Sequence, residues 1–316
     1  MQGFEYMEHE LLISDHPAVI EESIQLTTQD GCKIQGTYFV RNGNGHHPCA
    51  VVFNCGAGIA SRHYRYFAQF LASSGIPVLT YDYRGIGLSK PATLRKFQAT
   101  IEDWAEYDCA AAIDWLSVRT KKTRVFGVGH SVGSILFCGA PNSSVLAGLV
   151  MIGAHTAYYG DYRQAYRLPM AVLWHGVMPV LTSIFGFFPA KLLRLGDDIP
   201  KGVAMQWARR RTPIFGPQSA GVHSERMRRL VGRLSKAEFD ALILTITDDG
   251  FATKAGAARV REFLPLLHIN HQLISPAQAG RKRLGHFGFF RREASETLWP
   301  IVLRHLKTQS ELESVV

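Results

Sequence analysis

Short apolar runs alternate with helical patterns along most of this 316-residue chain. The expected strands are nearly all apolar, and they cover Ala50–Asn54, Pro77–Asp82, Arg124–Val128, Leu146–Ile152, Ala241–Thr247 and Ile269–Ser275. Helical spacing appears between them, at Tyr64–Ser73, Ile101–Leu116, Val132–Gly139, Lys254–Phe263 and Ser295–Leu306. Strands that are apolar on both faces and separated by helices are typical of a sheet covered on both sides. The pattern predicts an α/β fold with a mostly parallel, twisted sheet.

A β-hairpin is expected before this alternation, over Glu22–Val40, with its turn at Asp30-Gly31. After the sixth expected strand, no strand pattern appears from His155 to Ser235. We therefore expect a first part of the core at residues 1–154, a helical cap at 155–235 and a second part of the core at 236–316. An insertion at this place would lie over the carboxyl ends of the strands, where ligands bind in open α/β folds.

The apolar segment Leu168–Ala190 of this cap contains no charged residue. It is long enough to span a bilayer, but His175-Gly176, Pro179 and Gly186 interrupt it. Two interpretations remain open. The segment forms either a buried pair of cap helices that lines an apolar pocket, or a cap that touches a membrane surface.

The formal charge of +9 comes with short basic clusters. The clusters are Arg209-Arg210-Arg211, Arg226 with Arg228-Arg229, Arg281-Lys282-Arg283 and Arg291-Arg292. No zinc-finger or RNA-binding signature accompanies them, so a solvated basic face is expected and not a nucleic-acid partner. Positive charge near the mouth of a site would also favour an anionic, phosphate-bearing substrate.

Five widely spaced cysteines and no C-x-x-C pair indicate reduced thiols in a cytoplasmic protein, without a thiol-ligated zinc site. The acidic N-terminus lacks the basic and then apolar order of a signal peptide.

The strongest chemical motif is Gly129-His130-Ser131-Val132-Gly133, between an expected strand and an expected helix. G-x-S-x-G in this context is the nucleophile elbow, in which a tight turn exposes the serine hydroxyl above the sheet. Ser131 is therefore the predicted nucleophile.

A serine hydroxyl is a weak nucleophile at neutral pH and needs a base. His286 follows the last expected strand, as the chain order of Ser, Asp and His requires. His268 and His271 lie at or within that strand and are expected to pack. His155 is expected to face the pocket, but it precedes the acid. We predict His286 as the base.

Two aspartates, Asp248 and Asp249, follow the expected strand Ala241–Thr247. We predict Asp249 as the acid that holds the imidazole tautomer, with Asp248 as the alternative or as a cap of the following turn.

The backbone N–H groups that would form an oxyanion hole are expected from Val132 and from the loop Cys55-Gly56-Ala57-Gly58. We choose Ala57 in this loop, with Gly58 as the substitute. Asp82 and Arg84 are expected to tie their turn to neighbouring backbone and to take no part in catalysis.

The segment Tyr81-Asp82-Tyr83-Arg84-Gly85-Ile86-Gly87-Leu88-Ser89 resembles the strand-and-loop signature of the α/β-hydrolase family, and the elbow, Asp249 and His286 complete the likeness. Asp103-Trp104 with Leu284–Phe290 is similar to a bacterial subgroup of predicted hydrolases near the serine aminopeptidase-like branch. Cys55 stands where many members carry histidine, and Ser134 where many carry glycine. The resemblance implies an α/β-hydrolase fold and acyl hydrolysis without metal or cofactor.

These residues predict a serine hydrolase that cleaves a carboxylic ester or thioester with a hydrophobic acyl group through an acyl-enzyme on Ser131. The alternative is an acyltransferase that uses the same intermediate in lipid or secondary-metabolite synthesis. A ligand-binding module on a hydrolase scaffold is a third interpretation, which the complete Ser–His–Asp set disfavours. Peptidase activity is disfavoured because no acidic pair for a substrate amine is identifiable. Dehalogenases and epoxide hydrolases carry aspartate at the position of Ser131.

Overall fold

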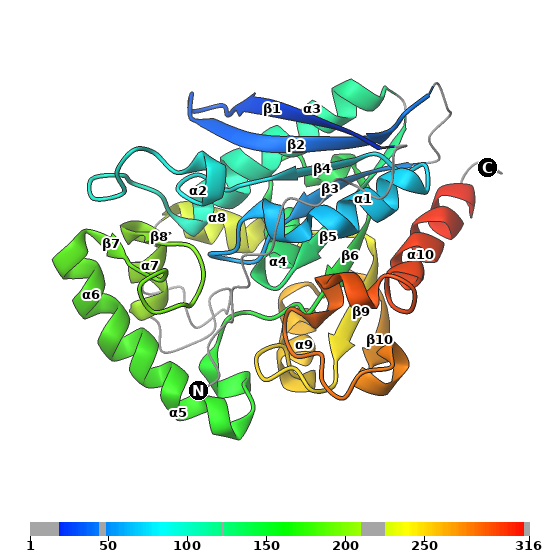
Figure 1. Ribbon diagram of the computed structural model, residues 1–316. Helices are drawn as coiled ribbons and strands as arrows, with labels where there is room; N and C mark the ends of the chain where they lie inside the picture. The colour runs from blue at the N-terminus through cyan, green and yellow to red at the C-terminus, as the bar shows by residue number, and fades with distance from the viewer. Residues whose placement is uncertain (1–18, 44–48, 122, 210–224, 313–316) are drawn as a thin grey trace.

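The central sheet of the computed structural model has the spatial order β1-β2-β4-β3-β5-β6-β9-β10 (Figure 1). The structure describes residues 19–43, 49–121, 123–209 and 225–312. The strands are β1 Val19–Thr27, β2 Lys33–Arg41, β3 Cys49–Asn54, β4 Val78–Tyr81, β5 Arg124–His130, β6 Leu146–Ile152, β9 Asp240–Ile246 and β10 His268–Ile274. β2 is antiparallel to β1 and β4, whereas the other neighbouring strands are parallel. The predicted mostly parallel sheet is confirmed.

The N-terminal hairpin pairs β1 with β2 in register from Val19↔Arg41 to Thr27↔Lys33. Its turn contains Asp30-Gly31, as predicted, and Gly31 has a φ of 81°. This left-handed conformation is costly for residues with a Cβ, which explains the glycine.

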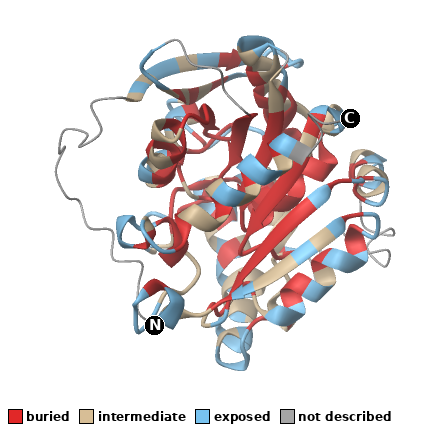
Figure 2. Ribbon diagram, turned by 90° about the vertical axis from the view of Figure 1, so that its right-hand side faces the viewer, coloured by how far each residue is buried: buried red, intermediate tan, exposed pale blue. Residues whose placement is uncertain are grey.

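Helices cover both faces of the sheet, so the central strands are buried (Figure 2). α1 (Arg65–Ser73) and α10 (Trp299–Leu312) contact each other on one side. α3 (Ala110–Thr120) and α4 (Val132–Gly139) contact the strands from the other side, and α9 (Lys254–Phe263) connects β9 to β10. The observed bounds of α4 and α9 agree with the predicted ranges.

The predicted helix Ile101–Leu116 is not one regular helix. It begins as α2 (Ile101–Asp103), passes through a π-helical segment at Trp104–Cys109 and continues as α3. Within the π segment, the Trp104 ring stacks on Tyr83, with ring centroids 4.8 Å apart and planes at 16°. The periodicity of apolar residues could not reveal this, since a π segment changes the helical repeat for a single turn only.

The described part of the segment between β6 and β9 is mainly helical. A helix of 22 residues covers Gln164–Phe185. It comprises α5 (Gln164–Val172), a π segment at Leu173–Val177 and α6 (Met178–Phe185). The two-residue strands β7 (Phe187–Phe188) and β8 (Ile199–Pro200) pair with each other and are followed by α7 (Lys201–Ala208). These strands were not expected, because two residues are too few to produce an alternating pattern.

The predicted buried pair of cap helices at Leu168–Ala190 is wrong. The structure has one helix there. Only 11% of the most apolar 18-residue stretch of this helix is buried. Pro179 falls in the first turn of α6, directly after the π segment, so the helix continues past it. The helix ends at Gly186, which has a φ of 81°.

α8 (Glu225–Leu234), the last helix before β9, packs on the core helix α4. A Cβ placed on Gly139 of α4 would lie 3.1 Å from Leu230 Cγ. All five cysteines are free thiols, and four of them are buried.

Candidate active site

Ser131 lies in the turn between β5 and α4 with φ 58° and ψ −135°, a conformation that residues with a Cβ rarely adopt. Its N–H donates to the Ile152 carbonyl on β6 at 2.9 Å. Both motif glycines are sterically required. A Cβ on Gly129 would lie 2.5 Å from Ser134 Cα, and one on Gly133 would lie 2.2 Å from the Cys55 carbonyl oxygen. The predicted strand–turn–helix elbow is therefore present.

Asp249 and His286 come together from the turns after β9 and β10. His286 Nδ1 lies 2.6 Å from Asp249 Oδ2, and Asp249 is 2% exposed. Burial raises the pKa of Asp249, but the positive charge and hydrogen bond of His286 outweigh it and lower this pKa to about 2. Asp249 is thus a carboxylate and can only accept, so His286 carries a proton on Nδ1. In the neutral imidazole Nε2 is then unprotonated.

The neighbouring Asp248 holds the loop that carries His286. Its carboxylate accepts the N–H of Leu284 at 2.9 Å and that of Gly285 at 3.0 Å. The turn cap that was expected of Asp248 is made instead by Asp249 Oδ1, which accepts the N–H groups of Phe251 and Ala252. The two aspartates therefore have different contacts, and only Asp249 bonds the imidazole.

His155 contacts the Ser131 hydroxyl directly, with 3.0 Å between His155 Nε2 and Ser131 Oγ. The N–H of Ala157 donates to His155 Nδ1 at 2.9 Å. Burial and the nearby charge of His286 lower the pKa of His155 to about 3, so the ring is neutral. A neutral imidazole whose Nδ1 accepts must carry its proton on Nε2. His155 therefore donates a hydrogen bond to Ser131 Oγ and cannot take its proton.

A second hydrogen-bond chain connects three parts of the site. The N–H of Gly56 donates to Tyr64 Oη at 2.9 Å, and Tyr64 Oη lies 2.8 Å from His130 Nδ1. His130 Nε2 lies 3.0 Å from the carbonyl oxygen of His286. A carbonyl only accepts, so His130 donates from Nε2 and the Tyr64 hydroxyl donates to Nδ1. The chain fixes the backbone of His286 relative to the elbow and the loop after β3.

No sequence pattern indicates that Tyr64 takes part in this hydrogen-bond chain, and the donor role of His155 was not predicted either. His130 was the only indication of this chain, because a polar residue next to buried strands needs hydrogen-bond partners. Of the other histidines, His271 bonds Thr245 Oγ1 at 3.0 Å, whereas His268 is largely exposed and does not pack as expected. β10 is the edge strand of the sheet, which explains that exposure.

The two N–H groups expected to form an oxyanion hole lie in the predicted elements. Val132 is the first residue of α4, where no intrahelical carbonyl accepts its N–H. In the loop after β3, the Gly56 N–H already donates to Tyr64, which leaves the next N–H, that of Ala57, as the candidate. Gly58 contacts the insertion, where its carbonyl accepts the Asp197 N–H at 2.7 Å.

Asp82 and Arg84 stabilise the fold outside the site. Asp82 accepts the N–H groups of Ser61 at 2.6 Å and Leu88 at 2.7 Å, as expected for a residue that ties its turn to backbone. The Arg84 guanidinium bonds carboxylates, with 2.7 Å to Asp108 and 2.6 Å to Asp30.

The basic clusters lie mostly on the surface. Arg281, Lys282 and Arg283 are exposed on the loop before His286. Arg226 pairs with Asp103 and Glu106. Two members of the first cluster, Arg210 and Arg211, lie outside the described residues. Within the described ranges, no group of three or more metal-ligating side chains is placed to hold a metal ion.

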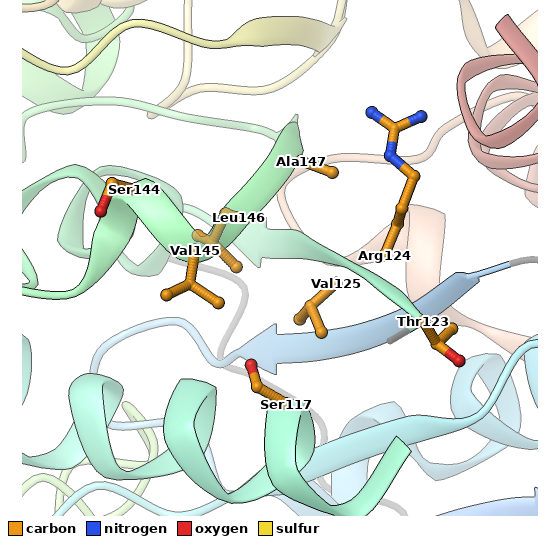
Figure 3. Close-up of a pocket in the computed structure, with 8 residues that line it drawn as sticks. All are labelled: Ser117, Thr123, Arg124, Val125, Ser144, Val145, Leu146 and Ala147. Carbon is orange, nitrogen blue, oxygen red and sulfur yellow. The ribbon is translucent and has the colours of Figure 1, made fainter. Parts of the chain in front are cut away.

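A surface depression lies at the amino ends of β5 and β6, the opposite end of these strands from Ser131 (Figure 3). Its lining residues include Ser117, Thr123 and Arg124. None of the Ser131, Asp249 or His286 side chains contributes to it, so it is separate from the candidate site.

The strand order, the elbow and the likeness to solved structures show that the chain has the α/β-hydrolase fold. Residues 45–184, less than half of the chain, match the model of the family described as serine aminopeptidase, S33. An uncharacterised protein of Mycobacterium tuberculosis is 30% identical over 138 residues, which cover 42% of this chain and 46% of that protein. The chain thus matches less than half the length of this curated relative.

Three solved structures illustrate the shared fold. An esterase of Pyrococcus furiosus is 14% identical, with a TM-score of 0.58 over 92% of this chain and 91% of its own. A monoacylglycerol lipase of Paleococcus ferrophilus is 16% identical, with a TM-score of 0.53 over 92% and 99%. A haloalkane dehalogenase of Bradyrhizobium elkani is 16% identical, with a TM-score of 0.58 over 94% and 100%. One fold thus accommodates different reactions, so the site must indicate the chemistry.

Proposed function

We propose that this protein is a serine hydrolase that cleaves a carboxylic ester or thioester with a hydrophobic acyl group. The observation that supports this best is the direction of the hydrogen bonds at two histidines. His286 is fixed by Asp249 with Nε2 unprotonated, whereas the unprotonated nitrogen of His155 already accepts the Ala157 N–H. A base and a hydrogen-bond donor therefore accompany the elbow serine.

In the proposed reaction, Ser131 Oγ attacks the acyl carbonyl while its proton passes to His286 Nε2. The N–H groups of Val132 and Ala57 stabilise the oxyanion. The tetrahedral intermediate collapses to acyl-Ser131, and the leaving alcohol or thiol takes the proton from His286. Water then attacks the acyl-enzyme, loses its proton to His286 and releases the carboxylic acid, and Ser131 recovers its proton.

Asp249 and His155 have different roles in this cycle, because Asp249 supports the base and His155 supports the nucleophile. The ionised Asp249 stabilises the imidazolium that forms when His286 takes the proton. His155 donates to Ser131 Oγ, so the hydroxyl hydrogen is free to be directed toward another acceptor, the base. His155 thus orients the nucleophile and does not compete for its proton.

The preference for a hydrophobic acyl group is supported by the aromatic rings beside these histidines. Tyr162, from the insertion, lies 5.7 Å from the His155 ring and 5.2 Å from Phe251 between centroids. Phe251 in turn lies 5.5 Å from the His286 ring. Aromatic walls favour apolar ligands over charged ones. We also propose a cytoplasmic location, which the five free thiols support.

A fluorophosphonate probe tests the activated serine, because it labels a serine only when a base withdraws its proton. We expect the full chain to be labelled once, at Ser131, and Ser131→Ala to remain unlabelled. p-Nitrophenyl esters and acyl-CoA thioesters of graded chain length then define the substrate class. Labelling without hydrolysis of either series, but with acyl transfer to an added alcohol or amine, would favour the acyltransferase. An unlabelled wild-type protein would refute the proposed function.

A further inference from the structure

The helix Gln164–Phe185 exposes an apolar face along its whole length. Leu168 is 73% exposed, Val172 55%, Val180 57% and Ile184 61%. Leu168 and Val172 are one turn apart in α5, and Val180 and Ile184 are one turn apart in α6, so the members of each pair lie side by side on the helix surface. We call this set the outer face. Figure 1 shows the helix at the periphery of the molecule, away from the central sheet. Exposed apolar side chains in such a row mark a binding surface.

The opposite side of the helix is attached to the protein from one end to the other. Near its beginning, the Arg163 N–H donates to the Gly250 carbonyl at 3.0 Å. In the middle, His175 Nδ1 lies 2.9 Å from the Ala208 carbonyl oxygen. In the last turns, Met178 and Thr182 are buried. A membrane-spanning helix would have to give up all these contacts, so the outer face can meet a bilayer only with the helix lying in its plane.

The charges beside the helix are complementary to anionic headgroups. No aspartate or glutamate occurs from residue 162 to 196. Arg163 and Arg167 are exposed at the beginning of the helix, and Arg194 is exposed shortly after its end, beside Lys191, which is exposed but pairs with Asp197 at 3.0 Å. Leu192, between Lys191 and Arg194, is 70% exposed. An apolar face between two basic ends is the arrangement of helices that bind at the surface of anionic membranes.

We propose that the outer face docks the protein on an anionic phospholipid bilayer, with the helix axis parallel to the surface. The inner side of the same helix approaches the candidate site. Trp174 contacts Tyr162 at 5.5 Å between ring centroids, and Tyr162 contacts His155, which bonds Ser131. If the proposed hydrolase function also holds, docking presents the site to acyl groups held in the bilayer. The docking itself does not depend on that function.

Vesicle sedimentation with the full chain tests the docking. The vesicles contain phosphatidylcholine alone or phosphatidylcholine with an equal amount of phosphatidylglycerol. We expect binding to the anionic vesicles that weakens with added salt, because salt screens the attraction of the basic ends. Leu168→Gln/Ile184→Gln removes apolar contact without changing charge and should weaken partitioning by about tenfold or more.

The matched control is Val118→Gln/Leu266→Gln, since these residues are 76% and 48% exposed but lie outside the insertion. The control should bind as the wild type does, and thermal unfolding should show that both variants are folded. Equal binding by the outer-face variant, or no binding by the wild type, would overturn the proposal. The wild type could also self-associate without lipid, and only the outer-face variant could abolish this. That result would identify a second copy of the chain as the occupant of the outer face, and it would overturn the proposal. Vesicle binding without probe labelling at Ser131 would refute the hydrolase function alone.

Discussion

At the scale of single residues, the hydrogen-bond partners of the site histidines decide their roles. His286, His155 and His130 are neighbours, with ring centroids 4.6 Å apart for His130 and His286 and 5.3 Å for His155 and His286. Each faces a partner that can only donate or only accept. The Asp249 carboxylate, the Ala157 N–H and the His286 carbonyl therefore assign one tautomer to each ring. We therefore expect these three histidines to have different roles: His286 is the base, His155 donates to Ser131 Oγ and His130 donates to the His286 carbonyl.

The histidine assignment predicts unequal effects of substitution on turnover. His286→Ala should lower kcat by on the order of 10⁴-fold or more, because the base is lost. His155→Leu should lower kcat by about tenfold with little change in KM, since one hydrogen bond to Oγ is lost. His155→Gln, which can still donate from its amide, should recover part of that loss. Steady-state kinetics on a p-nitrophenyl ester gives these values. A loss from His155→Leu as large as that from His286→Ala would show that His155 is the base.

Buried neutral histidines also predict acid sensitivity of the fold. Burial and the charge of His286 lower the pKa of His155 from 6.5 to about 3, and burial lowers that of His130 well below 6.5. Between these values the unfolded chain binds more protons, so stability rises with pH. The free energy of unfolding should therefore fall below about pH 6.5, by up to about 1.4 kcal/mol per pH unit for each histidine. Urea unfolding from pH 8 to pH 5 measures this slope. His155→Gln should flatten it, and an unchanged slope would contradict the neutral, buried assignment.

At the scale of elements, the site is built from turns that follow strands. Ser131 follows β5, Asp249 follows β9 and His286 lies on the loop after β10. Parallel strands bring these turns to one edge of the sheet. Close packing holds the elbow in place. Hydrogen bonds from backbone N–H groups to Asp249 and Asp248 hold the turn of Asp249 and the loop of His286.

The elbow predicts that Gly133→Ala is severely destabilising, because its Cβ would lie 2.2 Å from the Cys55 carbonyl oxygen. We expect a loss of about 3 kcal/mol in the free energy of unfolding. Gly232 in α8 is a matched control, since a Cβ there would meet nothing within 4 Å. Gly232→Ala should raise stability by about 0.5–1 kcal/mol. Chemical denaturation compares the two, and equal effects would show that the elbow does not pack as described.

The different contacts of Asp248 and Asp249 also predict different effects on kcat when each is substituted. Asp249→Asn should lower kcat by about 10⁴-fold, because the imidazolium loses its counter-charge and the tautomer is no longer fixed. Asp248→Asn retains one acceptor for the loop N–H groups, so kcat should fall by about tenfold or less. Kinetics and thermal unfolding of both variants test this. Comparable kinetic losses would mean that Asp248 acts through more than the position of the loop.

At the scale of the whole molecule, buried polar residues connect segments that are distant in the sequence. Arg84 joins the loop after β4 to Asp30 in the hairpin turn and to Asp108 in the helical segment before α3. Asp108 also accepts the Arg84 N–H at 2.8 Å, and its side chain has no exposed surface. The outer regions of the fold are thereby tied to the sheet near the site.

This connection predicts a cost that depends on the charge left behind. Arg84→Met should lower the free energy of unfolding by about 3–5 kcal/mol, because burial already raises the pKa of Asp108 to about 7 and, without Arg84, this carboxyl would have to take up a proton or stay ionised without its partner. Adding Asp108→Asn removes that charge and keeps an acceptor for the backbone, so the double variant should be more stable than Arg84→Met alone. Denaturant titration of the three proteins measures the difference. No recovery in the double variant would show that packing, and not charge, dominates at Arg84.

The sequence by itself determined the parallel sheet, the elbow and the candidate residues Ser131, Asp249 and His286, because strand patterns and short motifs are local. Only the tertiary structure decided which aspartate bonds His286, since Asp248 and Asp249 are adjacent and differ only in the direction of their side chains. It also decided the donor role of His155 and the contact of Tyr64 with His130, which join residues 24 and 66 positions apart. The exposure of the helix Gln164–Phe185 was likewise decided only by the tertiary structure. An apolar stretch indicates a surface that avoids water, but whether protein covers it depends on packing with residues elsewhere in the chain.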